Sequence, residues 1–141
     1  LVQLKKKGVI RAIGISGFPL DVLQEAAMLF EIDVILSYCK YTLLDQSLLN
    51  LKPFVTKNNL GLINASPFAM GLLTRHNCPD WHPFSKEKVN EVLALKKVAY
   101  NKGAPIEKLA LEFAQQCPIS ATTLTGFSSM ADLKKGLSWL M

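Results

Sequence analysis

Short polar segments that follow apolar runs carry the residues best suited to chemistry in this 141-residue sequence. They are small, hydroxyl-bearing and glycine-rich, and they stand at four places: Ser16-Gly17, Ser37-Tyr38, Ser66-Pro67 and Gly126 to Ser129. Such residues let backbone N–H groups come close to an anion. The last segment is the strongest candidate, because it leads into a predicted helix whose first N–H groups lack partners. It predicts a phosphate site.

Ser129 and Asp132 also allow a second interpretation. Their spacing has the form of a capping box, in which a hydroxyl and an acidic side chain satisfy the first N–H groups of a helix. The residues alone leave both roles open. The glycine motifs of the standard dinucleotide-binding and P-loop sites are absent from the sequence.

Two further groups of residues have weaker patterns. His76, Cys78 and His82 lie within one predicted loop, but their spacing matches no structural zinc pattern, so we predict no metal site. Tyr38 and Tyr41 flank Lys40, which suggests an acid/base group. Alternation along an extended segment would place Tyr41 on the opposite side from Tyr38 and Lys40. We therefore expect these residues to supply a side chain to the wall of a site and neighbours that face solvent, rather than an acid/base group. No complete catalytic set is evident.

Apolar runs of strand length alternate with helical patterns along the whole chain. The predicted strands cover residues 9–15, 33–37, 61–65 and 121–125. The first three predicted helices cover residues 19–30, 47–58 and 85–103, and two more begin at Pro105 and Ser129. The apolar face of the helix at 19–30 consists of Leu20, Leu23, Ala27 and Phe30. Ser85 is the expected N-cap of the third, and Lys5 to Lys7 are expected to end a helix ahead of Gly8.

This pattern amounts to four βα units with connections long enough for parallel strands. Two architectures fit it: a small doubly wound sheet, and half of an eight-fold βα barrel. A complete barrel needs about 250 residues. The chain begins with Leu1 in the middle of a pattern, which favours the half barrel and a piece of a longer protein.

The composition narrows the class of protein. Half of the residues are apolar and 19% are charged, which excludes intrinsic disorder. No apolar run is long enough to span a membrane. The net charge is +5, but the lysines are scattered, which is not typical of proteins that bind nucleic acids. Three cysteines without a Cys-x-x-Cys motif indicate a reducing, cytoplasmic compartment.

Three segments resemble the aldo-keto reductases. The run from Lys7 to Ser16 resembles the fifth strand of that family, Ala65 to Thr74 the end of the seventh, and Leu124 to Ser129 the eighth. Together with Trp81-His82-Pro83, the second run is most similar to the L-galactose dehydrogenase-like branch. The resemblance implies that residues 1–141 are strands 5–8 of a (β/α)8 TIM barrel of the NADP-dependent oxidoreductase type, with the N-terminal half absent.

The same resemblance implies a function and a set of site residues. The complete protein would transfer a hydride between NADP or NAD and a sugar-like or small carbonyl substrate. The Asp, Tyr, Lys and His tetrad of the family lies on the first four strands, so this chain would supply no catalytic residue and would be inactive alone. The residues implied to bind the cofactor are Ser16 and Tyr38 at the nicotinamide, Ser66, Phe68, Gly71 and Leu72 at the pyrophosphate, and Gly126, Ser128, Ser129 and Asp132 at the adenosine end.

The chain departs from the family pattern at several of these places. Gly17 replaces an asparagine, Tyr38 a glutamine and Ala65 a tyrosine, and Gly136 stands where an asparagine normally meets the adenine. Asp132 slightly favours NAD, because an acidic side chain accepts a ribose hydroxyl. The alternative function is a non-catalytic α/β binding or interaction module. A half barrel would also leave strand edges unpaired, so we expect the chain to self-associate.

Overall fold

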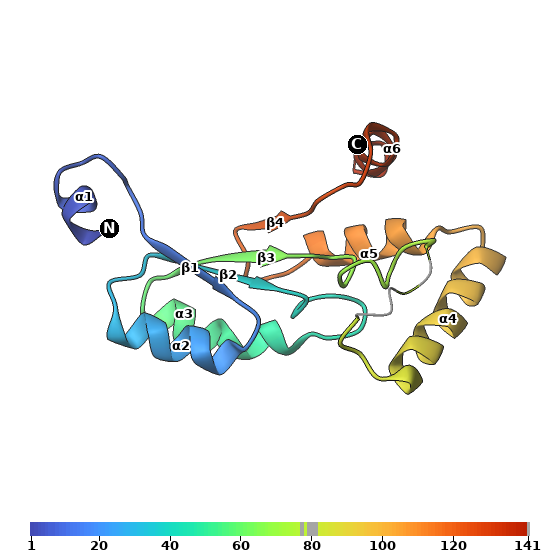
Figure 1. Ribbon diagram of the computed structural model, residues 1–141, viewed down its shortest axis with the longest axis horizontal. Helices are drawn as coiled ribbons and strands as arrows, with labels where there is room; N and C mark the ends of the chain where they lie inside the picture. The colour runs from blue at the N-terminus through green and yellow to red at the C-terminus, as the bar shows by residue number, and fades with distance from the viewer. Residues whose placement is uncertain (77, 79–81, 141) are drawn as a thin grey trace.

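The computed structural model describes residues 1–76, 78 and 82–140, and it contains one parallel sheet with helices (Figure 1). The four strands are β1 (Gly14–Gly17), β2 (Val34–Tyr38), β3 (Gly61–Ala65) and β4 (Thr122–Leu124). The helices are α1 (Val2–Lys6), α2 (Leu20–Leu29), α3 (Lys52–Lys57), α4 (Lys86–Asn101), α5 (Ile106–Gln115) and α6 (Met130–Ser138), and a 3₁₀ helix, η1 (Ser47–Leu51), precedes α3.

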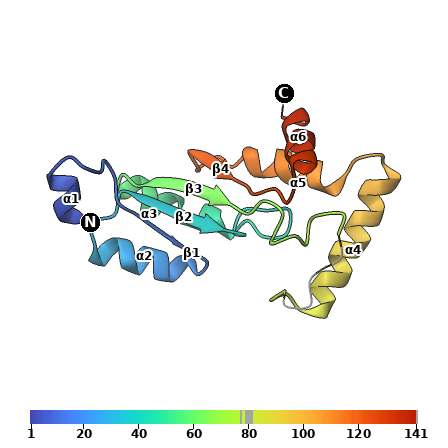
Figure 2. The same ribbon diagram turned by 45° about the horizontal axis from the view of Figure 1, so that its top comes forward.

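The order of the strands decides between the two predicted architectures. All pairs are parallel, and the order β1-β2-β3-β4 follows the chain without a reversal. Because crossovers are right-handed, a sheet that advances in one direction places its connecting helices on one face. Figures 1 and 2 show α2 and α3 on the same side of the sheet. A doubly wound sheet reverses direction and has helices on both faces. The doubly wound alternative is therefore wrong, and the fold is that of half a (β/α)8 barrel.

The main core lies between the sheet and these helices. Ile35 of β2 and Leu62 of β3 point into it and are buried against Leu23 of α2. Helix α5 closes the same layer, because the Phe113 ring stacks on Tyr41 with the ring centroids 4.9 Å apart. The apolar residues that alternate along the strands thus face the helices, as a barrel requires.

The opposite face of the sheet is covered much less. The strand register places Ser16, Leu36 and Ile63 in one row across this face, and Leu124 stands beside Ala65. Leu36 and Ile63 are only half-buried, and Leu124 is 55% exposed. This face would form the interior of a closed barrel, where side chains from opposing strands fill the space.

A second core supports the segment that follows β3. Leu72 and Leu73 are fully buried there, together with Val92 of α4 and Ala110 of α5. No helix or strand was predicted between residues 65 and 85, and the described residues directly after β3, 66–76, form a turn that packs against α4 and α5.

The largest error in the predicted elements is at the first strand. Residues 9–15 were predicted, but β1 begins at Gly14, and Val9 is 67% exposed. Pairing with β2 starts at Gly14 and Val34, while the Ile13 N–H donates to a carboxylate oxygen of Asp33 at 2.7 Å. The apolar run before Gly14 therefore has no partner strand.

Other boundaries agree more closely with the sequence. Residues 61–65 form β3 as predicted, and the Ser85 hydroxyl accepts a hydrogen bond from the Lys88 N–H at the start of α4. Gly8 and Gly103 follow α1 and α4 with positive φ, which confirms both predicted helix ends. Phe30 was predicted on the buried face of α2, but it follows the helix and is 66% exposed. Within the described part of the chain, no helix has the length and apolar character needed to cross a bilayer.

Candidate functional site

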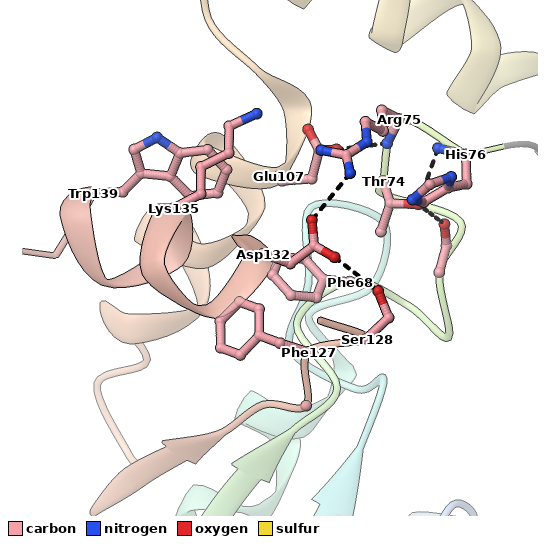
Figure 3. A pocket seen from close by; sticks show the side chains of 12 residues that line it. Phe68, Thr74, Arg75, His76, Glu107, Phe127, Ser128, Asp132, Lys135 and Trp139 are labelled. Atoms are coloured by element: carbon pink, nitrogen blue, oxygen red, sulfur yellow. Dashed lines mark hydrogen bonds and ion pairs between the residues drawn. The ribbon is translucent and has the colours of Figure 1, made fainter. Parts of the chain in front are cut away.

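A cavity of about 290 Å³ lies near the carboxyl ends of β3 and β4 (Figure 3). Its walls come from the segment after β3, the start of α5, and the segment that joins β4 to α6. The lining residues are Phe68, Gly71, Thr74, Arg75, His76, Glu107, Gly126, Phe127, Ser128, Asp132, Lys135 and Trp139. Ligands of open α/β sheets and barrels bind at this end of the strands, so the position is that of a binding site.

The segment after β3 forms one wall because it turns tightly. Ala69, Met70 and Gly71 all have positive φ, the region that favours glycine. The turn is fixed by a hydrogen bond from the Ser66 N–H to the Leu124 carbonyl at 3.1 Å, which joins it to β4. The buried ring of His82 supports it from below, with Nε2 2.9 Å from the Ala69 carbonyl.

Asp132 is the centre of the hydrogen-bond network in the cavity. One carboxylate oxygen accepts hydrogen bonds from the hydroxyls of Ser128 at 2.8 Å and Ser129 at 2.7 Å. The other oxygen accepts from the Arg75 guanidinium at 3.1 Å. These hydrogen bonds, led by that from Ser129, hold the pKa of Asp132 below its ordinary value. Asp132 is therefore a carboxylate in a fixed orientation.

Ser129 is also the N-cap of α6. Its hydroxyl oxygen accepts a hydrogen bond from the Asp132 N–H at 3.1 Å, as the capping-box interpretation predicts. The reciprocal contact differs from the standard motif, because the Asp132 carboxylate accepts from the two serine hydroxyls. Ser129 therefore caps α6 and takes part in the hydrogen-bond network around Asp132 at the same time.

Arg75 joins the three walls of the cavity. Its backbone N–H donates to the Glu107 carboxylate of α5 at 2.6 Å, and its guanidinium reaches Asp132 of α6. Figure 3 shows the Arg75 guanidinium above the cavity, with Glu107 beside it and Asp132 below it. The guanidinium is the strongest phosphate-binding group at this position, since its fork of donors suits phosphate oxygens.

Aromatic rings form the floor of the cavity. The Phe68 and Phe127 rings meet edge to face, with centroids 6.0 Å apart. Phe127 also packs against α6 at Gly136, where an added Cβ would lie 2.6 Å from two atoms of the ring. The glycine that departs from the family pattern is thus explained by the ring that occupies the space of its side chain.

The cavity brings together five of the ten residues predicted to bind the cofactor: Phe68, Gly71, Gly126, Ser128 and Asp132. Ser129 is joined to them through Asp132. Ser66 lies at the start of the turn, outside the lining. Leu72 is also outside, because its side chain is buried in the second core and its N–H donates to the Ala69 carbonyl. Its predicted role at the pyrophosphate stays a prediction.

Ser16 and Tyr38 lie at the same end of the sheet, on other strands. Ser16 is exposed on β1, and the Tyr38 ring lies 5.6 Å from that of Phe18. Lys40 is on the same side, with its ammonium 4.1 Å from the Phe18 ring centroid. Tyr41 is buried in the main core, which confirms the expected alternation. These residues form a wall next to β1 and β2, and no acid/base group.

The other weak motif also has a structural explanation. His82 is buried, and its second ring nitrogen accepts a hydrogen bond from the Phe84 N–H. His76 lines the cavity and is exposed. Among the described residues, no cluster of three side chains has the composition and proximity to hold a metal ion.

Sequence reasoning missed several lining residues, mainly those that bear charge. Arg75 is one of only two arginines in the chain and follows directly on the motif that ends at Thr74, which was a usable signal. Lys135 and Trp139 lie three and seven residues after Asp132, on the same face of a helix. Nothing in the sequence around Glu107 marked it as a site residue, because only the folding of the chain brings the start of α5 to the cavity.

A family model described as the Aldo/keto reductase family matches residues 1–140. The chain belongs to the aldo/keto reductase family. It is 38% identical to L-galactose dehydrogenase from Arabidopsis thaliana in an alignment of 141 positions, which covers 98% of this chain and 44% of that protein. It is 31% identical to D-arabinose 1-dehydrogenase from Saccharomyces cerevisiae, again over 44% of the relative and 97% of this chain.

A solved structure of similar fold is the apo form of an aldo-keto reductase from Bacillus halodurans. It superimposes with a TM-score of 0.73 at 25% identity, over 99% of this chain and 48% of that one. The holo form of the same protein gives a TM-score of 0.70. This aldo-keto reductase chain thus spans less than half the length of each of these relatives.

Proposed function

We propose that the chain is the part of an NAD(P)-dependent aldose dehydrogenase that forms strands 5–8 of its barrel and binds the adenosine end of the cofactor. The observation that carries this proposal is the cavity in which Asp132, Ser128, Gly126 and Arg75 meet near the ends of β3 and β4. Membership of the aldo/keto reductase family supports a nicotinamide cofactor and a carbonyl or alcohol substrate.

The residues of the cavity fit such a group. Arg75 and Lys135 would neutralise phosphate, and the Asp132 carboxylate would accept hydrogen bonds from ribose hydroxyls. A Cβ at Gly71 or Gly126 would meet no atom within 4 Å, so their backbones leave room for a ligand. The volume of about 290 Å³ is at the lower end of ordinary ligand sites, about 300–1,000 Å³, and suits one end of a dinucleotide.

When bound, the nicotinamide group would supply or accept the hydride. The role of this chain is to hold and orient the cofactor: Ser16 and Tyr38 lie where strands 5 and 6 would face the nicotinamide, and the cavity would hold the other end. We assign no catalytic residue to the chain, because none of its tyrosines matches the position of the tyrosine in the family's tetrad. The names of the relatives, which include D-threo-aldose 1-dehydrogenase from a Pseudomonas species, support an aldose substrate.

Cofactor binding can be measured through Trp139, which lines the cavity. The chain has two tryptophans, so a Trp81→Phe variant reports from Trp139 alone. NAD and NADP titrated into this variant should quench its fluorescence in a saturable way, and Ser128→Leu should weaken the binding because the larger side chain fills the cavity. Absence of saturable quenching with either cofactor, together with unchanged calorimetric titrations, would count against the proposed site.

We further propose that the chain alone lacks dehydrogenase activity and self-associates through the poorly covered face of its sheet. Burial of apolar surface contributes about 25 cal/mol per Å², and Leu36, Ile63 and Leu124 lie on this face. Size-exclusion chromatography with light scattering should give species larger than 15.6 kDa. A monomer with sharp, cooperative unfolding would refute the association, and turnover of an aldose by the pure chain would separately refute the absence of catalysis.

A further inference from the structure

A second, larger cavity adjoins the first. Its volume is about 660 Å³, and it shares Arg75, Glu107 and Lys135 with the proposed cofactor cavity. The remaining walls are the last turns of α4 and the start of α5, through Lys96, Lys97, Tyr100, Asn101 and the run from Gly103 to Ile106. The family's predicted site residues include none of these.

The two cavities differ in charge. The first contains two cationic side chains, Arg75 and Lys135, and two carboxylates. The second contains these two cations together with Lys96 and Lys97, and among its described lining residues Glu107 alone carries a carboxylate. Cationic groups brought together without matching carboxylates favour the binding of an anion.

Within the described part of the chain, none of Lys96, Lys97 and Lys135 forms an ion pair. The Lys96 ammonium donates instead to the backbone carbonyl of His76 at 2.9 Å. Partial burial lowers the pKa of Lys96, which is the effect expected of a cation removed from water without full compensation. An anion would supply that compensation.

The backbone adds a further attraction for negative charge. Helix α5 begins at the wall of this cavity, and its N-cap residue, Pro105, provides no side-chain hydrogen bond to the first N–H groups. The positive end of the helix dipole therefore lies at a wall of the cavity that contains the lysines. Tyr100, in the last turns of α4, also lines the cavity and is 84% exposed.

We propose that the second cavity binds a phosphate-bearing small molecule with at least two negative charges, separately from the nicotinamide cofactor. Lysines on flexible stems suit the many oxygens of a phosphate group, and the exposed Tyr100 ring leaves room for the organic body of a nucleotide or a sugar phosphate. The shared wall at Arg75 and Lys135 places this ligand beside the cofactor cavity.

The test uses inorganic pyrophosphate as the probe, titrated calorimetrically into the 141-residue chain at 0.15 M salt. We expect a Kd below about 1 mM and a loss of about tenfold in affinity in the double variant Lys96→Gln, Lys97→Gln, since charged hydrogen bonds are removed. The matched control is Lys52→Gln, Lys57→Gln, which removes the same charge from α3 on another part of the molecule and should bind normally. ADP in place of pyrophosphate tests whether the cavity accepts an organic body.

Three results would overturn the proposal. An equal loss of affinity in the two double variants would mean a general effect of net charge. Complete displacement of pyrophosphate by saturating NADP would assign the lysines to the cofactor site. A Kd above about 10 mM for pyrophosphate would mean that no specific site exists. Circular dichroism spectra and unfolding midpoints of all variants, measured in the same buffer, establish that each is folded.

Discussion

Gly136 offers a sharp test of how the cofactor cavity is built, because replacing it by alanine should destabilise the chain although alanine is the better helix former. A Cβ at this position would lie 2.6 Å from Cε1 and Cζ of Phe127. No real Cβ tolerates such a contact, so the ring must move. When it moves, it leaves its edge-to-face contact with Phe68 on the floor of the cavity.

The change in the free energy of unfolding caused by Gly136→Ala is the sum of two opposing contributions. Replacing glycine by alanine within a helix stabilises it by up to about 1 kcal/mol. Overpacking costs about 1–3 kcal/mol, and this range includes the loss of an aromatic pair, about 0.5–1.5 kcal/mol. We expect a net destabilisation of about 1 kcal/mol, which lowers the midpoint of thermal unfolding by about 4 °C in a chain of this size. Calorimetry at a fixed protein concentration measures this change.

A double-mutant cycle separates the two terms. Phe127→Leu removes the ring atoms that clash, so in that background Gly136→Ala should become stabilising by up to about 1 kcal/mol. Gly136→Ala alone should also weaken NAD(P) binding, because the displaced ring enters the cavity. If Gly136→Ala stabilises the chain equally in both backgrounds, the ring does not occupy the space next to α6 and the reasoning fails.

Three further predictions concern single side chains. Ser129→Ala should destabilise α6 by about 1 kcal/mol through loss of its N-cap, as measured by denaturant unfolding, with Ser138→Ala as a control on the same helix. In the complete protein, Asp132→Arg should shift the ratio of kcat/KM toward NADP; an unchanged ratio would show that Asp132 only caps the helix. The Lys5 ammonium and the Ile13 N–H lower the pKa of Asp33, so its stabilising contribution is full above 3.8, the pKa it would have when unfolded, and is lost as the pH falls through the lower folded value. The stability difference between the wild type and Asp33→Asn should therefore shrink below that pH, and a constant difference down to pH 3 would contradict the assignment.

The sequence predicted the fold well because the fold depends on alternation and capping, which are local. The third strand, the Ser85 and Ser129 caps and the glycines after α1 and α4 could all be located from neighbouring residues. The first strand was misplaced because its apolar residues do not reveal where the partner strand begins. The strand begins only at Gly14 because the Ile13 N–H donates its hydrogen bond to the Asp33 carboxylate and not to a carbonyl of the next strand.

The candidate site was predictable only in part, for a similar reason. Gly126, Ser128 and Asp132 share one short segment, so a motif could reveal them together. Arg75 follows directly on the motif that ends at Thr74, so its position could have been noticed, whereas Glu107 reaches the cavity from a separate helix in which no pattern marks it. Leu72 also lies within a motif of the family, but the sequence did not show that its side chain packs against residues of α4 and α5 in the second core.

The contacts that form the cavity also indicate which of them a bound ligand would replace. The segment after β3 and helix α6 meet through the Arg75–Asp132 ion pair and the Phe68–Phe127 ring contact. The Arg75 side chain is 55% exposed in that pair, and exposed ion pairs stabilise proteins only slightly. A phosphate group could therefore take over the Arg75 guanidinium at little cost, while the two serine hydroxyls keep Asp132 in its ionised form and fixed orientation. Asp132 would in that case keep its hydrogen bonds with Ser128 and Ser129, and with them the cap of α6.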